Sequence, residues 1–338
     1  MQRNDWPTPE WQAADPAALN MDAEKLAALD PVITSEYSNM NGIVIVRNGY
    51  IAYERYYKGY GPDDTHHVAS VTKSLLSALM GIAIDAKFIQ GADQKVLDFF
   101  PDYVPDAAEP QKRDITLRHL LTMTAPYPFE NWQEPLDKMC MQPNWVTYTL
   151  DMLGQQGRMG EFKYSTAGAH LLSAIITRST GQSAREFANE RLFKPIGMKE
   201  IPDYPMTSFG FDDLFGKKVR GWVEDPNRNS TGGWGLTLRP RDMARFGWLY
   251  LNRGMWDNQQ VISKAWIDKS TTMTPHKYGY LWWLSEEDGG FAAVGDGGHI
   301  ICCLPEQDLV VAIASEFIMN PRDRWTLIKE HIIPAVLD

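Results

Sequence analysis

Ser70 and Lys73 are the two residues of this chain whose types and spacing most suggest chemistry. They stand at the head of an apolar run over residues 75–84, and residues three apart in a helix lie on one face, one turn apart. A hydroxyl beside an amine can act as a nucleophile if the amine takes its proton. Because burial among apolar side chains disfavours the charged amine and lowers its pKa, Lys73 could serve as a base near neutral pH. Unpaired N–H groups at the helix start would favour a developing oxyanion.

The surroundings of this pair decide between a catalytic pair and a solvated surface pair. A Ser-x-x-Lys spacing arises by chance about once in a chain of this length, and a lone example is more often on the surface. The residues around this pair are apolar: Val68, Val71, Leu75, Leu76 and Leu79. Because a helix that is apolar nearly all round is buried, the sequence favours a buried amine beside Ser70.

Tyr164 is the second candidate, in a loop directly before a predicted helix over residues 167–180. Gly181, which follows that helix, is typical of the position after a helix end. A phenol that is hydrogen-bonded to an amine could relay a proton to a leaving group. The alternative is a packed aromatic ring with a satisfied hydroxyl.

The third candidate is the segment 295–299, which reads Gly-Asp-Gly-Gly-His. Glycines at a strand edge allow a ligand to approach the backbone closely. An N–H near Asp296 or Gly297 could then complete an oxyanion hole with the N–H of Ser70. The alternative is a tight hairpin turn between two strands.

Composition and charge exclude several classes of function. The chain has 338 residues, 44% of them hydrophobic, and a net charge of −10, which disfavours nucleic acid or an anionic membrane as the main partner. The three cysteines, Cys140, Cys302 and Cys303, give neither a disulfide framework nor a zinc spacing. The N-terminus shows no apolar leader and no apolar stretch is long enough to span a bilayer, so we expect a cytoplasmic protein.

The order of predicted elements indicates an α+β fold. Asn48-Gly49 predicts a hairpin within residues 42–57. Further strands are predicted over 280–284, 291–294, 300–304 and 309–314, and further helices over 22–38, 117–121 (capped by Thr116), 240–251 and 321–337. Strands at both ends with helices between them imply one antiparallel sheet built from both termini, flanked by helices, with a mostly helical insertion. We therefore expect a single domain over 1–338, with sheet-containing parts at 20–68 and 271–338 and a mostly helical subdomain at 69–270.

These motifs together resemble a known family. Ser70-x-x-Lys73, then Tyr164-Ser165-Thr166, then a glycine-rich strand turn is the motif order of the serine β-lactamase and penicillin-binding-protein superfamily. The similarity is greatest to the class C β-lactamase-type esterases and peptidases. Segments 68–74, 115–124, 240–247 and 304–311 also resemble this family, and the resemblance extends from about residue 40 to residue 335.

The resemblance implies a β-lactamase/transpeptidase-like fold and a role for each motif. Ser70 would be the acylated nucleophile, Lys73 its base and Tyr164 the general acid/base partner. The oxyanion hole would use the N–H of Ser70 and an N–H near Asp296 or Gly297.

Two departures from the family pattern bear on the substrate. The second motif ends in Thr166 where the family has an Asn that binds the substrate amide. The third motif lacks the family's Lys-Thr-Gly, whose Lys holds a carboxylate; Asp296 stands there instead, and His299 is the nearest base. Because Asp296 would repel a carboxylate, we expect little β-lactamase or transpeptidase activity.

We therefore predict a serine hydrolase that acts on a small neutral or cationic ester or amide, similar to the esterase branch and to the 6-aminohexanoate-oligomer hydrolases. The predicted cleft residues are Asp296, Gly297, Gly298, His299, Thr166, Tyr127 and Trp234. For Tyr127 and Trp234, ordinary loop packing is an equal alternative.

Two other functions remain open at this stage: a β-lactamase or D-amino acid peptidase, and a non-catalytic binding or sensor protein on the same scaffold. The sequence predicts no metal site and no cofactor, since His66-His67 and the other histidines lack ligand spacing. The expected partner is a small molecule, and the oligomeric state is left open.

Overall fold

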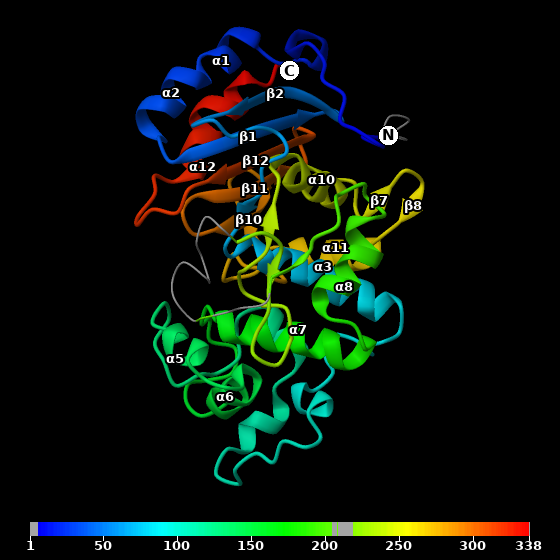
Figure 1. Cartoon of the computed structure of the whole chain (residues 1–338), viewed down its shortest axis with the longest axis vertical. Helices are drawn as coiled ribbons and strands as arrows, with labels where there is room; N and C mark the ends of the chain where they lie inside the picture. The colour runs from blue at the N-terminus through cyan, green and yellow to red at the C-terminus, as the bar shows by residue number, and fades with distance from the viewer. Residues whose placement is uncertain (1–5, 205–207, 209–218, 338) are drawn as a thin grey trace.

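Both ends of the chain contribute to one antiparallel sheet. The computed structural model describes residues 6–204, 208 and 219–337, and within these residues the sheet has six strands in the order β2-β1-β12-β11-β10-β9 (Figure 1). The strands are β1 (Met40–Arg47), β2 (Tyr50–Tyr56), β9 (Trp283–Leu284), β10 (Phe291–Gly295), β11 (His299–Leu304) and β12 (Leu309–Ser315). β1 pairs with β12, so the N-terminal hairpin lies beside the last strand, which confirms the predicted sheet from both termini.

Backbone conformation at single residues explains the hairpin between β1 and β2 and the short length of β9. Asn48 and Gly49 have φ values of 53° and 93°, and positive φ at both central residues is typical of a two-residue hairpin turn. The predicted strand over 280–284 is shorter in the structure, because Leu281 has a φ of 61° and leaves the extended conformation.

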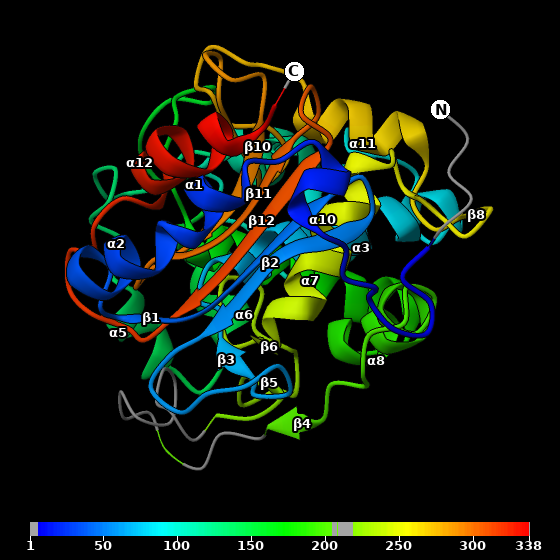
Figure 2. The same cartoon turned by 90° about the horizontal axis from the view of Figure 1, so that it is seen from above.

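Alternating side chains of the sheet pack against helices on its two faces. Ile43 and Ile45 face the layer formed by α1 (Ala23–Ala27), α2 (Leu29–Glu36) and α12 (Arg324–Leu327), and Figure 2 shows these helices lying over the strands. Val44 and Val46 face the opposite side, where α10 (Pro240–Leu251) packs against β12, β11 and β1. The sheet therefore lies between two helical layers.

The terminal helices differ in detail from the prediction. The single helix expected over 22–38 is two helices, α1 and α2, that meet at Ala28. The helix expected over 321–337 starts only after Asp323, whose carboxylate accepts a hydrogen bond from Trp325 N, and continues through a π-turn at Ile328–Ile332. It then tightens at Ile333–Ala335, because Pro334 has no N–H to continue the α-helical ladder.

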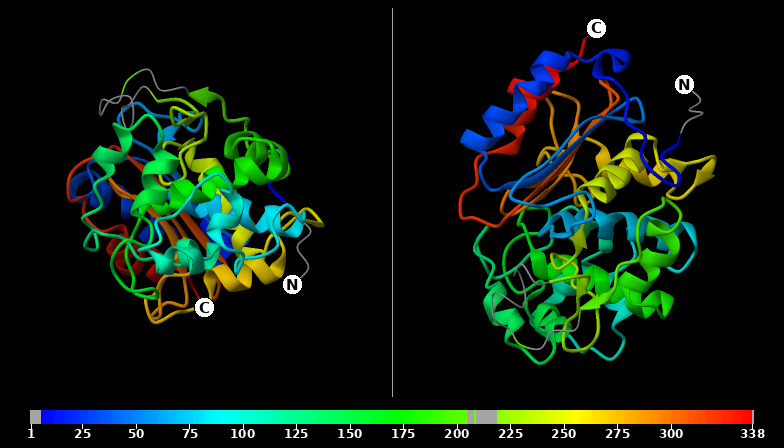
Figure 3. Two further views of the ribbon diagram at one scale, coloured as in Figure 1. Left: turned by 90° about the horizontal axis from the view of Figure 1, so that it is seen from below. Right: turned by 45° about the horizontal axis from the view of Figure 1, so that its top comes forward.

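α3 (Val71–Asp85) is the central helix of the mostly helical part below the sheet (Figure 3). Every residue from Val71 to Ala83 is buried, as the apolar pattern predicts. The other helices of this part are α4 (Leu117–Leu121), α5 (Leu136–Cys140), α6 (Trp145–Met152), α7 (Thr166–Thr180), α8 (Ala184–Ala188) and α11 (Lys264–Thr271), of which α7 and α8 pack directly on α3. Short strand pairs join the segments around them: β3 (His66–His67) with β6 (Thr237–Leu238), β4 (Asp203–Tyr204) with β5 (Trp222–Val223), and β7 (Met255–Trp256) with β8 (Gln259–Gln260).

The division into subdomains stays a prediction, although all strands of the large sheet fall within 20–68 and 271–338. α10 belongs by sequence to the mostly helical part but packs on the sheet. Among the described residues no helix is both long and apolar enough to cross a membrane. A cytoplasmic location stays a prediction.

Candidate active site

Ser70 lies at the first turn of α3, where the chain enters the helix through a strained residue. Ala69 has a φ of 47°, a left-handed conformation that is uncommon for a residue with a Cβ and that concentrates at functional sites. The end of β10 packs directly on this turn: a Cβ at Gly295 would lie 2.3 Å from Val68 O and 3.2 Å from Ser70 N. The glycine therefore allows the strand end to approach the backbone N–H of Ser70.

The Lys73 amine is buried and surrounded by three oxygen atoms. Its Nζ lies 2.9 Å from Ser70 Oγ, 3.2 Å from Thr166 Oγ1 and 2.8 Å from Gly233 O, and the residue is 1% exposed. A neutral amine has two hydrogens and one lone pair. Thr166 Oγ1 and Gly233 O can accept the two hydrogens, which leaves the lone pair directed at the Ser70 hydroxyl.

Burial lowers the pKa of Lys73 from its ordinary value to about 8, against the opposing effect of two carboxylates, Glu134 and Asp296. At pH 7 about one amine in ten is then neutral, whereas an exposed lysine would be almost wholly protonated. An amine with this pKa can accept a proton near neutral pH.

Tyr164 lies beside this pair, half-buried in the loop before α7. Lys73 Nζ is 4.8 Å from the centre of its ring, and the Ser70 hydroxyl is close enough to act on the pKa of the phenol. Burial raises the pKa of Tyr164 above its ordinary value, although the nearby Ser70 side chain partly lowers it. The phenol is therefore protonated at neutral pH, whereas part of the Lys73 amine is neutral there and can accept a proton.

A loop over residues 131–134 lies against the Tyr164 segment. Asn131 Oδ1 accepts a hydrogen bond from Tyr164 N at 2.9 Å. The indole of Trp132, 63% exposed, stacks on the Tyr164 ring at 4.9 Å between ring centres. Glu134 binds the residues that follow Tyr164. The sequence analysis named Tyr127, earlier in this loop, but not Asn131 or Glu134, because a side chain that binds a distant backbone leaves no local pattern.

The glycine-rich segment is both a hairpin turn and a neighbour of Ser70. Gly297 and Gly298 have φ values of 86° and 92°, which a tight turn between β10 and β11 requires. Asn39 Nδ2 donates to Gly297 O at 2.6 Å, and Arg324 Nε donates to Gly298 O at 3.2 Å, so the turn is braced from behind. Asp296 is exposed, and its charge acts on Lys73 and on Tyr164.

The other predicted cleft residues differ in placement. Thr166 Oγ1 accepts a hydrogen bond from the Lys73 amine. Tyr127 is 1% exposed, and Trp234 and His299 are each 2% exposed. None of these last three offers a surface to a substrate. Tyr127 stacks on Phe129 with ring centres 5.1 Å apart, and Trp234 stacks on Trp145 at 5.6 Å. The loop-packing alternative therefore describes both rings, because large aromatic side chains gain most from burial.

His299 is likewise part of the sheet rather than of a cleft. Its Nδ1 accepts a hydrogen bond from Ser315 N at 3.3 Å, and burial holds its pKa well below the ordinary value. The sequence analysis also missed the carbonyl of Gly233, a main-chain group with no side-chain signal.

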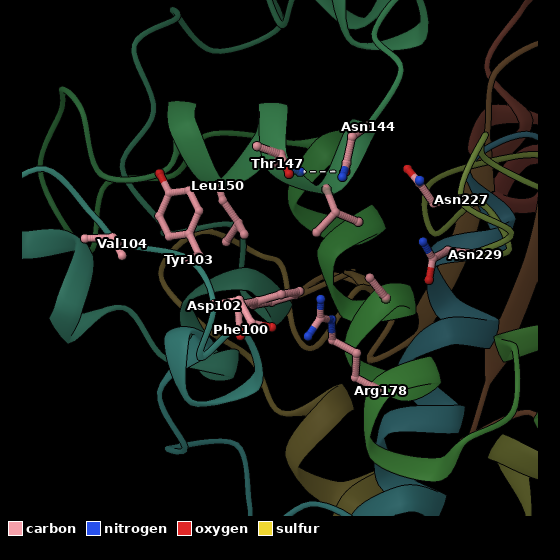
Figure 4. Close-up of a pocket in the computed structure, with 12 residues that line it drawn as sticks. Phe100, Asp102, Tyr103, Val104, Asn144, Thr147, Leu150, Arg178, Asn227 and Asn229 are labelled. Atoms are coloured by element: carbon pink, nitrogen blue, oxygen red, sulfur yellow. Dashed lines mark hydrogen bonds between the residues drawn. The ribbon is translucent and has the colours of Figure 1, made fainter.

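A separate pocket of about 550 Å³ lies farther along α7 (Figure 4). Its lining includes Tyr103, Asn144, Arg178 and Asn229. In the described part of the chain none of the predicted site residues lines it, so this pocket is distinct from the Ser70 site.

The chain is similar to known proteins over most of its length. The β-lactamase family model matches residues 37–324. The 6-aminohexanoate-dimer hydrolase of Paenarthrobacter ureafaciens is 23% identical over 94% of this chain and 84% of its own length. The esterase EstB of Burkholderia gladioli is 24% identical over 55% of this chain and 54% of its own length. Among solved structures, a putative 6-aminohexanoate-dimer hydrolase from Bacillus anthracis superimposes with a TM-score of 0.74 at 19% identity, covering 99% of this chain and 89% of that one. Since the family model spans most of the sequence, the chain belongs to the β-lactamase family and is a hydrolase of that family, with relatives named as an esterase and as a 6-aminohexanoate-dimer hydrolase.

Proposed function

We propose that the protein cleaves a small ester or amide through an acyl-enzyme on Ser70. The observation that carries this proposal is the 2.9 Å contact between Lys73 Nζ and Ser70 Oγ, with acceptors in place for both hydrogens of the neutral amine. An amine buried to this degree and aimed at a hydroxyl has a chemical use, whereas a structural role would be served as well by an apolar side chain.

The reaction proceeds in two halves. Ser70 Oγ attacks the substrate carbonyl while Lys73 takes the hydroxyl proton, and the oxyanion accepts hydrogen bonds from the N–H of Ser70 and an N–H near Asp296 or Gly297. The Lys73 proton then passes through the Tyr164 hydroxyl to the departing alcohol or amine. Water attacks the ester on Ser70 and gives one proton back along the same path, which releases the acid and restores the serine.

Charge around the site favours neutral or cationic substrates. Asp296 is exposed at the turn beside Ser70, and Glu134 lies half-buried next to Lys73. A carboxylate near the scissile bond would meet these two negative charges. The names of the relatives, an esterase and a 6-aminohexanoate-dimer hydrolase, support ester and amide bonds as the class of bond cleaved.

The test is burst kinetics with p-nitrophenyl acetate and butyrate, followed by intact-protein mass spectrometry. We expect a burst of nitrophenolate and one acyl group per chain in the wild type, and neither in Ser70→Ala. Ser74→Ala is the matched control, because Ser74 lies on the same helix and its hydroxyl only donates to Leu281 O. The proposal is contradicted if Ser70→Ala is acylated to the same extent as the wild type, or if no acyl donor labels the wild type. Fast turnover of a chromogenic cephalosporin would favour a β-lactamase instead.

A further inference from the structure

Three donors from the start of α7 hold the carboxylate of Glu134. Oε1 accepts from Ser165 Oγ at 2.8 Å and from Ala167 N at 2.9 Å, and Oε2 accepts from Thr166 N at 2.6 Å. The first N–H groups of a helix have no partner inside it, and the positive end of the helix dipole favours a negative charge there. Glu134 therefore binds the start of a 15-residue helix from an earlier loop.

The same loop also binds Tyr164, the residue just before these donors. Asn131 Oδ1 accepts from Tyr164 N, and the Trp132 indole stacks on the Tyr164 ring with an angle of 18° between the planes. Side chains from residues 131–134 thus contact four consecutive residues, 164–167. These contacts fix the backbone of the segment that carries Tyr164 and Thr166.

Thr166 joins Glu134 to the amine. Its N–H donates to Glu134, and its Oγ1 accepts from Lys73. The charge of Glu134 also acts directly on Lys73 and raises the pKa of the amine, as does the charge of Asp296. The remaining titratable group that faces Lys73 is Tyr164, whose phenol is neutral at working pH. Glu134 is therefore linked to Lys73 both through a hydrogen-bonded residue and through its charge.

We propose that Glu134 is a positioning residue of this site, which fixes Tyr164 and Thr166 against Lys73 and whose negative charge stabilises the protonated amine. The inference rests on the proposed function, because it assigns Glu134 a part in the same reaction without contact with the substrate. Its carboxylate is occupied by its three donors and is directed at the helix start rather than at Ser70.

The experiment compares Glu134→Gln with the wild type by two readouts. The first is the titration of Lys73 in protein labelled with carbon-13 at lysine Cε, followed by NMR, with the Lys73 signal assigned from its loss in Lys73→Arg. Burial lowers the pKa of Lys73, and the negative charge of Glu134 opposes this effect. Without that charge we expect the Lys73 midpoint to fall by about 0.5–1 pH unit. The second is the pH dependence of kcat/KM, whose rising limb should move to lower pH by the same amount.

Turnover should fall as well, because a Gln amide group cannot accept hydrogen bonds from all three donors. We expect kcat to drop by roughly 10- to 100-fold, with a smaller change in KM, since misplacement of catalytic groups by a fraction of an ångström has effects of this size. Glu130→Gln is the matched control: it removes the same charge from an exposed side chain of the same stretch and should leave both readouts unchanged.

An unchanged Lys73 midpoint in Glu134→Gln overturns the charge role of Glu134. Because the NMR titration uses no substrate, it gives this answer even if no acyl group forms on Ser70, so the two proposals fail separately. Glu134→Asp separates charge from position: the midpoint should stay within about 0.2 pH unit of the wild type while kcat falls. An unchanged kcat in Glu134→Asp overturns the positioning role, and this variant also serves if Glu134→Gln does not fold.

Discussion

Replacement of Lys73 by methionine should remove activity and, at neutral pH, relieve the protein of a buried charge. Methionine has nearly the length of the lysine stem and fills irregular apolar space well. The pKa of Lys73 is lowered from 10.5 to about 8 in a side chain that is 1% exposed. The difference between these two pKa values, about 2.5, lowers the free energy of unfolding of the wild type by about 3 kcal/mol at pH 7. Lys73→Met does not have this penalty.

The sign of this effect follows from proton binding. Between pH 8 and 10.5 the unfolded chain binds a proton at Lys73 that the folded chain does not, so the stability of the wild type rises with pH in this window. The penalty is complete below pH 8 and absent above 10.5. Integrated from pH 7 to pH 9, this effect raises the free energy of unfolding of the wild type by about 1 kcal/mol relative to that of Lys73→Met. The hydrogen bonds of Lys73 to Thr166 and Gly233 act equally at both pH values and cancel from this comparison.

The assay is urea unfolding of both proteins at pH 7 and pH 9, together with acylation of each by p-nitrophenyl acetate. We expect the stability difference to change by about 1 kcal/mol in favour of the wild type at pH 9, and acylation of Lys73→Met to be slower by roughly 100- to 10,000-fold. A stability difference that is the same at both pH values would refute the claim that burial lowers the pKa of Lys73. Acylation at the wild-type rate would refute Lys73 as the base.

Two further predictions concern the pH profile and the glycine-rich turn. The kcat/KM of the wild type should rise with pH and level off above about 8, the pKa of Lys73, and should not fall again below pH 10, because the pKa of Tyr164 is raised; a rising limb near pH 4 to 5 would point to a carboxylate base instead. Gly298→Ala should lower the unfolding free energy by about 1–3 kcal/mol and slow acylation, since φ is 92° and the new Cβ would lie 2.6 Å from Arg324 Nη2. Gly59→Ala, at a φ of 80° with nothing within 4 Å, is the control and should affect stability but not acylation.

The sequence predicted best those features that depend on residues close together in the chain. The proximity of Ser70 and Lys73 follows from helical spacing, and the burial of the amine follows from the apolar residues around it. The hairpin at Asn48-Gly49 and the helix over 240–251 depend on equally local signals. These predictions needed no knowledge of the tertiary fold.

Features that depend on distant segments were not accessible in this way. The approach of Tyr164 to Ser70 came from the family resemblance, because no local pattern joins a loop to the start of a distant helix. Tyr127 and Trp234 were ambiguous for the opposite reason: an aromatic residue in a loop near a site can line a cleft or fill the core, and here both rings fill the core. The contacts of Glu134 with the start of α7 could not be predicted at all, since its partners are mostly backbone N–H groups.

The two carboxylates near Lys73 connect the pKa of the amine with the substrate charge that we propose. Burial alone would lower the pKa of the amine further, and the charges of Glu134 and Asp296 bring it back to about 8. On this proposal the same negative charges oppose a substrate carboxylate, most directly at Asp296, which is exposed and follows Gly295, the residue packed against the N–H of Ser70. A lysine in place of Asp296 would attract a carboxylate but would also lower the pKa of Lys73, because a nearby positive charge disfavours a second one. In this chain, therefore, Asp296 helps to keep the pKa of Lys73 at about 8. A residue at position 296 that attracts a substrate carboxylate would require a compensating change around Lys73.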